Sequence, residues 1–523
     1  MKSSISIYSL FNFIIYNYVY IFSLVTLINF FFAITPLVAI FILVISATSS
    51  FLSTKYMSLD IFALERESVS FSRTVVIILF LIFLIWSFII VNRPNTGTDA
   101  NIYHLPLSLF INNSIWYPGI AKLSSHFGFP NGTSVLASVF TSFGYASFEV
   151  IPNLVTWLVY GMGIYFYLLK KNVSVLISLI STCMFILTPY IFYESYNMGT
   201  DLPCAFFITF GLAALYNRYY EDSLLFFSLS AIFKTLGLLA YFLVLPYILL
   251  IFMRKKTKYS IWKPKIFLSF ILLLASLLRV YIATGNPIYP AIPINLAAPW
   301  GISQDIQSNI VNGLKNYSGI EKTFFGIVMF MINFVVSPHS VKSGYWFSPF
   351  LVISAIISLF LIVKMRDLSF ININFLYTCF VMIIMSVLWI AYSPLFRFIL
   401  GVLIFINLQL FIFLYNRSTR ILRSISIAVL CGVLLIFSFN VYEKLTTTIL
   451  PLINASPKKI EQAMPWYGKE VETVFTTEQT DDGFIYSKST TNFCQRMPPP
   501  CISRRSVANE KELVQAYRKY NKL

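Results

Sequence analysis

Residue types that move protons follow directly on a long apolar run near the start of the chain. The run Thr74 to Val91 carries no charge and is long enough to cross a bilayer core of about 30 Å. The polar turn after it places Asp99, Tyr103 and His104 just past the expected membrane edge. A carboxylate there can draw a proton from a lipid-borne substrate. The alternative is that Asp99 only caps a helix beginning near Ile102, since Asp is favoured at helix N-termini.

Three cations, Lys234, Arg279 and Arg397, lie within or at the end of apolar runs. A charge in hydrocarbon costs at least about 2.5 kcal/mol unless it pairs, snorkels or faces water. Arg279 and Arg397 lie near the expected outer ends of their helices, and Lys234 lies at the break between two short ones. We expect all three to converge on one outward-facing cavity that could bind phosphate. A salt bridge or snorkelling is the structural alternative for each.

Asp201 begins another apolar run, in NMGTDLPCAFF, at the expected outer mouth of a helix. With Asp99 it would place carboxylates opposite the cations, which suits a base beside a phosphate leaving group. The alternative is again a helix cap, and Pro203 fits a first helical turn.

The remaining polar side chains near these runs favour structural roles. His104 reads more simply as a surface aromatic, and Glu149 and Glu194 as interfacial charges. His126 and His339 stand apart, and three scattered histidines are too few to indicate a metal site.

Composition places the chain in a membrane. It is 58% hydrophobic and 11% charged, whereas soluble domains carry about 25% charged residues. The net charge of +17 does not indicate a nucleic-acid partner, because the basic residues flank apolar runs. The first apolar run continues into a second without a cleavage site, which predicts retained helices and no signal peptide.

Thirteen apolar runs could cross the membrane, and the basic residues orient them. Eighteen Lys and Arg fall in loops assigned to the inside and five in loops assigned to the outside, which puts the N-terminus inside and the tail outside. Residues 324–336 are apolar but short, so we assign them as interfacial or re-entrant. The runs are Ile5–Ile28, Phe30–Leu52, Thr74–Val91, Val150–Leu169, Val173–Phe192, Leu202–Tyr216, Leu224–Thr235, Leu236–Phe252, Ile266–Ala283, Tyr345–Val363, Phe370–Tyr392, Phe396–Leu414 and Ser424–Val441.

The predicted organisation has three parts. Residues 1–73 hold two helices and an inside loop, residues 74–442 form a membrane core with outer loops 92–150 and 285–344, and residues 443–523 form a small outer region. Cys494 and Cys501 lie in that outer region and are expected to form a disulfide in an oxidising compartment.

The order of these features resembles the GT-C superfamily of integral-membrane glycosyltransferases. The resemblance runs over roughly Thr74 to Leu414 and rests on the outer Asp99, TDLPCAFFITFGLAALYNRYY, LSAIFKTLGLLAYFLVLPYILL and PLFRFILGVLIFI. It implies that the chain takes a sugar from a polyprenyl-phosphate carrier on the outer side of the membrane. YHLP, GNPIYP and FCQRMPPPC are also similar to bacterial envelope membrane proteins of unassigned function.

The resemblance implies roles for individual residues. Asp99 takes the place of the acidic residue that acts as base or orients the acceptor. Asp201 matches a second acidic residue linked to donor or metal binding, which implies a divalent metal ion as a cofactor. Lys234 matches the Lys of the FKT element, and Arg397 matches the Arg of an RY-like element, here followed by Phe398.

These features predict an all-α, GT-C-like polytopic protein of the bacterial inner membrane, with a cytoplasmic N-terminus and an extracytoplasmic C-terminus. The expected activity moves a sugar from an undecaprenyl-phosphate or diphosphate carrier to an envelope glycan, lipid or protein. Asp99 would be the base, and the three cations, with Tyr103 and His104, would bind substrate and phosphate. The alternatives are an O-antigen-type polysaccharide polymerase, or a flippase that binds lipid-linked glycans without chemistry.

Overall fold

The structure is a computed structural model. It describes residues 7–62, 69–91, 100–144, 146–254, 263–290, 296, 298–316, 373–392 and 396–417, together with short pieces between residues 442 and 519. Asp99, Cys494 and the segment 324–336 lie outside the described residues, as do the predicted crossings Tyr345–Val363 and Ser424–Val441.

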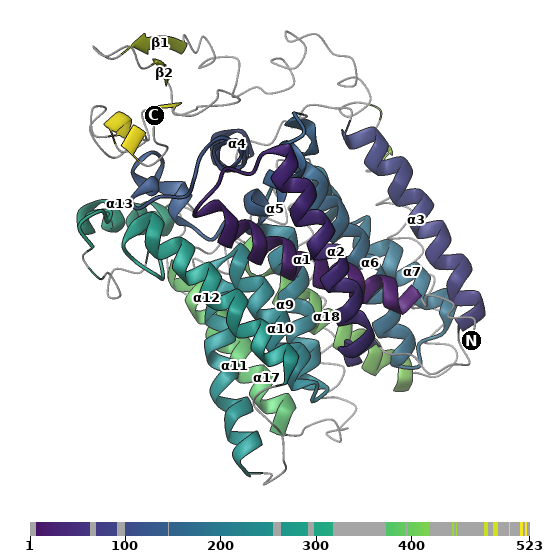
Figure 1. Cartoon of the computed structure of the whole chain (residues 1–523). Helices are drawn as coiled ribbons and strands as arrows, with labels where there is room; N and C mark the ends of the chain where they lie inside the picture. The colour runs from purple at the N-terminus through teal and green to yellow at the C-terminus, as the bar shows by residue number, and fades with distance from the viewer. Residues whose placement is uncertain are drawn as a thin grey trace.

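The described chain is mostly helical, as predicted (Figure 1). Four described helices are long and apolar enough to cross a membrane: Ser9–Asn29, Pro36–Tyr56, Phe148–Lys170 and Pro264–Thr284. They indicate a membrane protein, whereas thirteen crossings and the orientation of the termini stay predictions. The described helices of the bundle are α1 (Ile7–Asn29), α2 (Pro36–Tyr56), α3 (Val69–Val91), α6 (Ile151–Lys170), α7 (Val175–Ile186), the short α8 (Pro189–Ser195), α9 (Asp201–Tyr216), α10 (Tyr220–Phe233), α11 (Thr235–Arg254), α12 (Pro264–Thr284), α13 (Gln304–Asn316), α17 (Ile373–Tyr392) and α18 (Phe396–Arg417).

Proline and glycine set several helix boundaries. Pro36, Pro189 and Pro264 each stand at the start of a helix, where the missing N–H costs nothing. The run predicted as one crossing over Val173–Phe192 is not one continuous helix: α7 ends before Pro189 and α8 begins there. The break predicted at Lys234 is confirmed, because α10 ends just before it and α11 begins just after it.

Helix α9 lies at the centre of the bundle. Every residue from Asp201 to Leu215 is buried, as expected for a helix that is apolar on all sides. It packs against α6, α10, α11, α17 and α18. Gly401 lets α18 approach closely, since a Cβ there would lie 2.6 Å from the Ala205 carbonyl oxygen. The hydroxyl of Thr209 donates to the Gly401 carbonyl at 3.1 Å.

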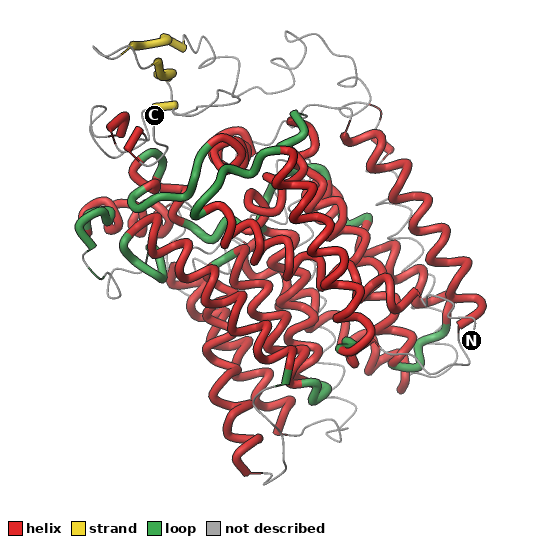
Figure 2. Tube along the Cα trace, in the orientation of Figure 1, coloured by secondary structure: helices red, strands yellow, loops and turns green. Residues whose placement is uncertain are grey.

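Short helices cover one end of the bundle, which we call the α4–α5 end (Figures 1 and 2). They are η3 (Ala100–His104), α4 (Leu105–Asn113), η4 (Ile120–Lys122), η5 (Ser125–Gly128), α5 (Gly132–Thr141) and η6 (Ala146–Val150). A further short helix, η1 (Asp60–Phe62), follows α2 at the opposite end. The α4–α5 end carries the N-terminus of α9 and the C-termini of α10 and α12, because Thr133 bonds Gly199, Gly132 abuts Ile232 and Trp116 bonds Arg279.

The tail adds a small sheet that the all-α prediction did not include. Strand β2 (Ile485–Ser489) lies between β1 (Phe475–Gln479), with which it pairs antiparallel, and β3 (Cys501–Ile502), with which it pairs parallel. At the other end of the chain, α1 packs against α2, α5, α6 and α12. The predicted boundaries at residues 73 and 442 stay predictions.

Candidate functional site

Asp201 and Lys234, two residues singled out from the sequence, form an ion pair at the α4–α5 end. The Lys234 ammonium donates to Asp201 Oδ1, and the Tyr190 hydroxyl donates to Asp201 Oδ2 at 3.1 Å. Only 7% of the Asp201 side chain and 18% of the Lys234 side chain are exposed. A salt bridge was the structural alternative for Lys234 in the sequence analysis. Lys234 does form one, and it lies at the α4–α5 end of the bundle.

Helix ends favour one charge of the pair more clearly than the other. Asp201 is the first residue of α9, whereas Lys234 lies between the last residue of α10 and the first residue of α11. A helix N-terminus favours an anion and a C-terminus favours a cation, each by about 0.3–1 kcal/mol or somewhat more when partly buried. The α9 N-terminus therefore supports Asp201, while the end of α10 and the start of α11 act on Lys234 in opposite senses, so Asp201 is what compensates its charge.

A network of hydrogen bonds holds the loop between α8 and α9 that leads into the pair. The Asn153 amide donates to the carbonyls of Glu194, Asn197 and Gly199 at 3.1, 2.8 and 2.9 Å. The Thr133 hydroxyl donates to Gly199 at 3.1 Å. A side chain at Gly199 would collide with the Glu194 carboxylate. Glu194 is thus a buried residue packed against this loop, and its sequence interpretation as an interfacial charge was incomplete.

Tyr103 and His104 lie inside the cover of the α4–α5 end. His104 is buried and its Nδ1 lies 3.1 Å from the Ser134 hydroxyl. Tyr103 is half-buried, and its ring stacks on His126 with centroids 4.6 Å apart. The interpretation of His104 as a surface aromatic is therefore wrong, because α4 and α5 cover it.

The segment that follows Asp99 begins beside the loop that carries Asp201. Ala100, the first described residue after Asp99, is buried in one cluster with Leu105, Ala137 and Met198. Met198 is three residues before Asp201. The chain that enters η3 is thus adjacent to the chain that enters α9.

Arg397 is the second residue of α18, and its side chain lies outside the described residues. Gly401 meets Ala205 and Tyr216 meets Phe405, so α9 and α18 run parallel. The first turn of α18 therefore lies at the same end as the Asp201–Lys234 pair.

Arg279 lies at the α4–α5 end but in a different environment. Its guanidinium carbon lies 3.6 Å from the centre of the Trp116 ring, and the Trp116 indole N–H donates to the Arg279 carbonyl at 3.0 Å. It lines a small cavity whose walls include neither Asp201 nor Lys234. The described residues thus form two polar sites where the sequence predicted one.

The metal and disulfide predictions find no support in the part of the chain that is described. Within it, no group of three His, Cys, Asp or Glu side chains could hold a metal ion. Both Asp201 oxygens accept hydrogen bonds, from Lys234 and Tyr190. Cys501 begins β3, but its side chain and Cys494 lie outside the described residues, so their pairing stays a prediction.

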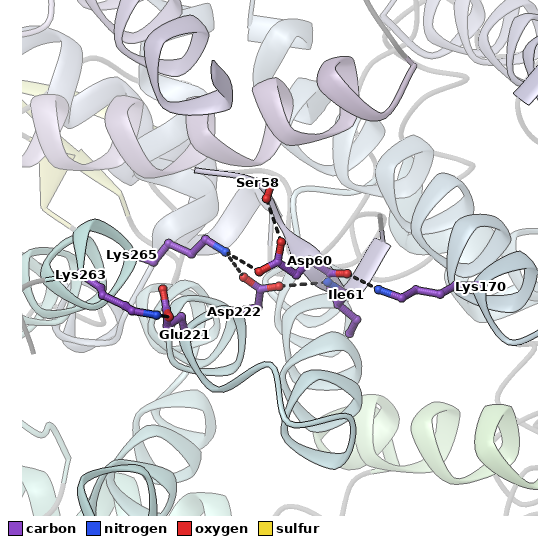
Figure 3. A network of polar contacts seen from close by, with 8 residues as sticks. All are labelled: Ser58, Asp60, Ile61, Lys170, Glu221, Asp222, Lys263 and Lys265. Carbon is purple, nitrogen blue, oxygen red and sulfur yellow. Dashed lines mark hydrogen bonds and ion pairs between the residues drawn. The ribbon is translucent and has the colours of Figure 1, made fainter. Parts of the chain in front are cut away.

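A second charged cluster, at the opposite end of the bundle, was not foreseen (Figure 3). Lys265 Nζ lies 2.6 Å from Asp222 Oδ1 and 3.7 Å from Asp60 Oδ2. The Ile61 backbone N–H donates to Asp222 Oδ2 at 3.1 Å, and the Lys170 ammonium donates to the Asp60 carbonyl. This cluster joins η1 and the end of α6 to the first turns of α10 and α12.

The sequence held a weak signal for this cluster. Lys263 and Lys265 were counted with the basic residues of an inside loop, yet only 7% of the Lys265 side chain is exposed. The pair Glu221 and Asp222 opens an apolar helix 43 residues earlier, so acidic and basic residues begin two apolar helices. Burial raises the pKa of the Asp222 carboxyl to about 6, against the opposing effects of Lys265 and the Ile61 N–H.

Comparison with known proteins adds a family but no activity. No curated protein and no solved structure matches the chain. One family model, described as a domain of unknown function (DUF8201), matches residues 3–404. This match covers most of the chain, including both predicted N-terminal helices and the Asp201–Lys234 pair, so the protein belongs to the DUF8201 family.

Proposed function

We propose that the protein is a membrane glycosyltransferase that moves a sugar from a polyprenyl-phosphate or diphosphate carrier to an envelope glycan, lipid or protein. One observation carries the proposal. Asp201 and Lys234, which the GT-C resemblance selects from separate segments 33 residues apart, meet in one ion pair at one end of the bundle. The start of α18, which carries Arg397, and the segment after Asp99 lie at the same end.

The proposed reaction divides the roles among these residues. The acceptor hydroxyl attacks the anomeric carbon, its proton passes to the Asp99 carboxylate, and the bond to the carrier phosphate breaks with both electrons leaving on phosphate. Lys234 and Arg397 stabilise the departing phosphate. Lys234 is bonded to Asp201 before substrate binds. The carrier phosphate must therefore replace the Asp201 carboxylate as the partner of the Lys234 ammonium.

Asp201 has a positioning role in this scheme. It holds Lys234 at the site in the absence of substrate and, once phosphate binds, can accept a hydrogen bond from a sugar hydroxyl. The described donors do not fit a metal ion, since Lys234 and Tyr190 bond both Asp201 oxygens. No step is therefore routed through a metal.

Two carboxylate substitutions test the proposal in membranes that contain a labelled polyprenyl-phosphate sugar. Asp99→Asn keeps the shape of the side chain but removes its basicity, so transfer should fall by about 10²- to 10⁴-fold. Asp201→Asn should also impair transfer, because it weakens the hold on Lys234. Binding of the carrier should persist in both variants, measured by equilibrium retention on the purified protein.

The matched control is Asp305→Asn. Asp305 is an exposed carboxylate in the first turn of α13, so this variant tests the loss of a helix-end charge alone and should transfer normally. Near-normal transfer by Asp99→Asn would reject the catalytic assignment, because Asn caps a helix about as well as Asp. Retained carrier binding in that case would favour the flippase.

A further inference from the structure

Arg279 is a buried cation whose terminal nitrogens have no hydrogen-bond partner among the described residues. The residue is 5% exposed, and within the described part of the chain neither Nη1 nor Nη2 has a hydrogen-bond acceptor. Buried guanidinium groups are normally paired with an anion. Phe22 of α1, Leu107 of α4 and Trp116 line the same cavity as Arg279, so its side chain is enclosed by the protein and does not reach the surface.

The Trp116 ring contacts only the flat face of the Arg279 guanidinium. An aromatic ring stacks against the flat face of a guanidinium, whereas the N–H donors point outward in its plane. The stacking distance of 3.6 Å therefore leaves the two terminal nitrogens as open donors. A buried charged donor without a partner destabilises the folded state, so an acceptor at the edge of the guanidinium would be strongly favoured.

The cavity beside Arg279 fixes the size of that acceptor. Its volume is about 10 Å³, roughly the space that one water molecule occupies. A sugar ring does not fit, and a phosphate group would need the walls to move. Asn131 and Ser276 are its polar lining residues besides Arg279, and the other lining residues, Trp116 among them, are apolar or aromatic.

The walls of this cavity are held by hydrogen bonds. The Trp116 backbone N–H donates to the Asn29 carbonyl at 2.7 Å, and the Asn29 amide donates to the Ser114 carbonyl at 2.9 Å. The Asn131 amide donates to the His126 carbonyl at 2.8 Å. These bonds restrain Trp116 and Asn131 at the wall, and the small volume together with the Arg279 charge favours a small anion.

We propose that Arg279, stacked on Trp116 and flanked by Asn131 and Ser276, forms a binding site for a monatomic anion of the size of chloride. The anion would accept hydrogen bonds from the guanidinium edge and neutralise the buried charge. It would tie α12 to the chain that covers the α4–α5 end. This site is separate from the Asp201–Lys234 pair and does not depend on the proposed transfer reaction.

Anion-dependent thermal unfolding of the full chain in detergent tests the site. Sodium chloride is titrated against sodium gluconate at constant ionic strength, and the wild type should show a saturable rise in Tm with chloride. Arg279→Met should abolish the saturable rise. Arg279→Lys keeps the charge without the planar fork and should weaken the apparent chloride affinity by about tenfold or more. Lys234→Met, which removes the other cation at this end, should keep the wild-type response.

A second measurement covers an Arg279→Met variant that does not fold. Bromide quenches indole fluorescence on contact, so saturable quenching of the wild type should lose one component in Trp116→Phe. The site is rejected if chloride and gluconate act alike on the wild type, or if Arg279→Met responds as the wild type does. It is also rejected if inorganic phosphate raises the Tm and chloride does not, since the cavity would then open to a larger anion.

Discussion

Two buried lysine–aspartate pairs lie at opposite ends of this bundle, and they are built differently. Asp201–Lys234 joins the first residue of α9, where a carboxylate is favoured, to the residue between α10 and α11, where the two helix ends act on the lysine in opposite senses. Asp222–Lys265 joins two helix N-termini, those of α10 and α12. An N-terminus favours Asp222 and opposes Lys265, so the carboxylates must hold Lys265 in place.

The two pairs also differ in the number of their polar partners and in their exposure to solvent. Lys265 has two carboxylates near its ammonium, and Asp222 also accepts a backbone N–H. Lys265 and Asp222 are 7% and 1% exposed, against 18% and 7% for Lys234 and Asp201. The Asp222–Lys265 pair therefore connects α10, α12 and η1 as a structural clasp, whereas the Asp201–Lys234 pair is more exposed and has fewer charged partners.

The largest expected effect comes from Lys265→Met. It leaves Asp222 buried without its cation, and breaking a buried pair from one side costs about 3–5 kcal/mol. The measurement is the free energy of unfolding in mixed micelles at neutral pH. Lys263→Met is the control: Lys263 pairs with Glu221 and is 33% exposed, so its loss should cost at most about 1 kcal/mol.

The clasp assignment fails if the two lysine variants lose equal stability. The double variant Lys265→Met/Asp222→Asn should recover much of the loss, because no charge is then left buried alone.

A pH titration gives the next largest effect. The Asp222 carboxyl has a folded-state pKa of about 6, above the value of 3.8 for an exposed group. The folded state therefore binds the extra proton between these values, so its contribution is complete below about pH 4 and is lost as the pH rises through 6. The total change is up to about 3 kcal/mol.

The difference in unfolding free energy between the wild type and Asp222→Asn isolates this group. The wild type should lose stability relative to Asp222→Asn as the pH rises from 4 to 6. A difference that stays flat over this range would show that Asp222 is ionised throughout.

The contrast between the two pairs also shows what the sequence could reveal. Asp201 and Lys234 were recognisable because each is a lone charge at the boundary of an apolar run, where membrane energetics makes charge expensive. Lys265 follows a cluster of basic residues and was counted as part of a solvated loop. Its burial depends on η1, which follows α2 far earlier in the chain, and no local pattern records that contact.

The fold, like the two pairs, could be predicted only in part from the sequence. Helical class and the break at Lys234 follow from local chemistry, and so does the break at Pro189, although the continuous apolar run across Pro189 concealed it. The position of Arg279 beside Trp116 was not predictable, because the residues are 163 apart and meet only through the packing of α12 against η4 and η5. Sequence patterns located the charges, and tertiary packing decided their partners.

The smallest expected effect comes from Tyr190→Phe, and it tests whether the Asp201–Lys234 pair is more than a clasp. The change removes one hydrogen bond, that of 3.1 Å to Asp201 Oδ2, and should lower the free energy of unfolding by about 0.5–1.5 kcal/mol. Tyr241→Phe is the matched control, since it removes a buried hydroxyl 3.3 Å from Ser269 and touches neither pair. Both variants should lose similar stability, but only Tyr190→Phe should slow glycan transfer, because the Asp201 carboxylate then loses a hydrogen bond that orients it toward Lys234. Equal transfer rates in the two variants would mean that the orientation of Asp201 does not matter to function, and the two pairs would then differ in exposure alone.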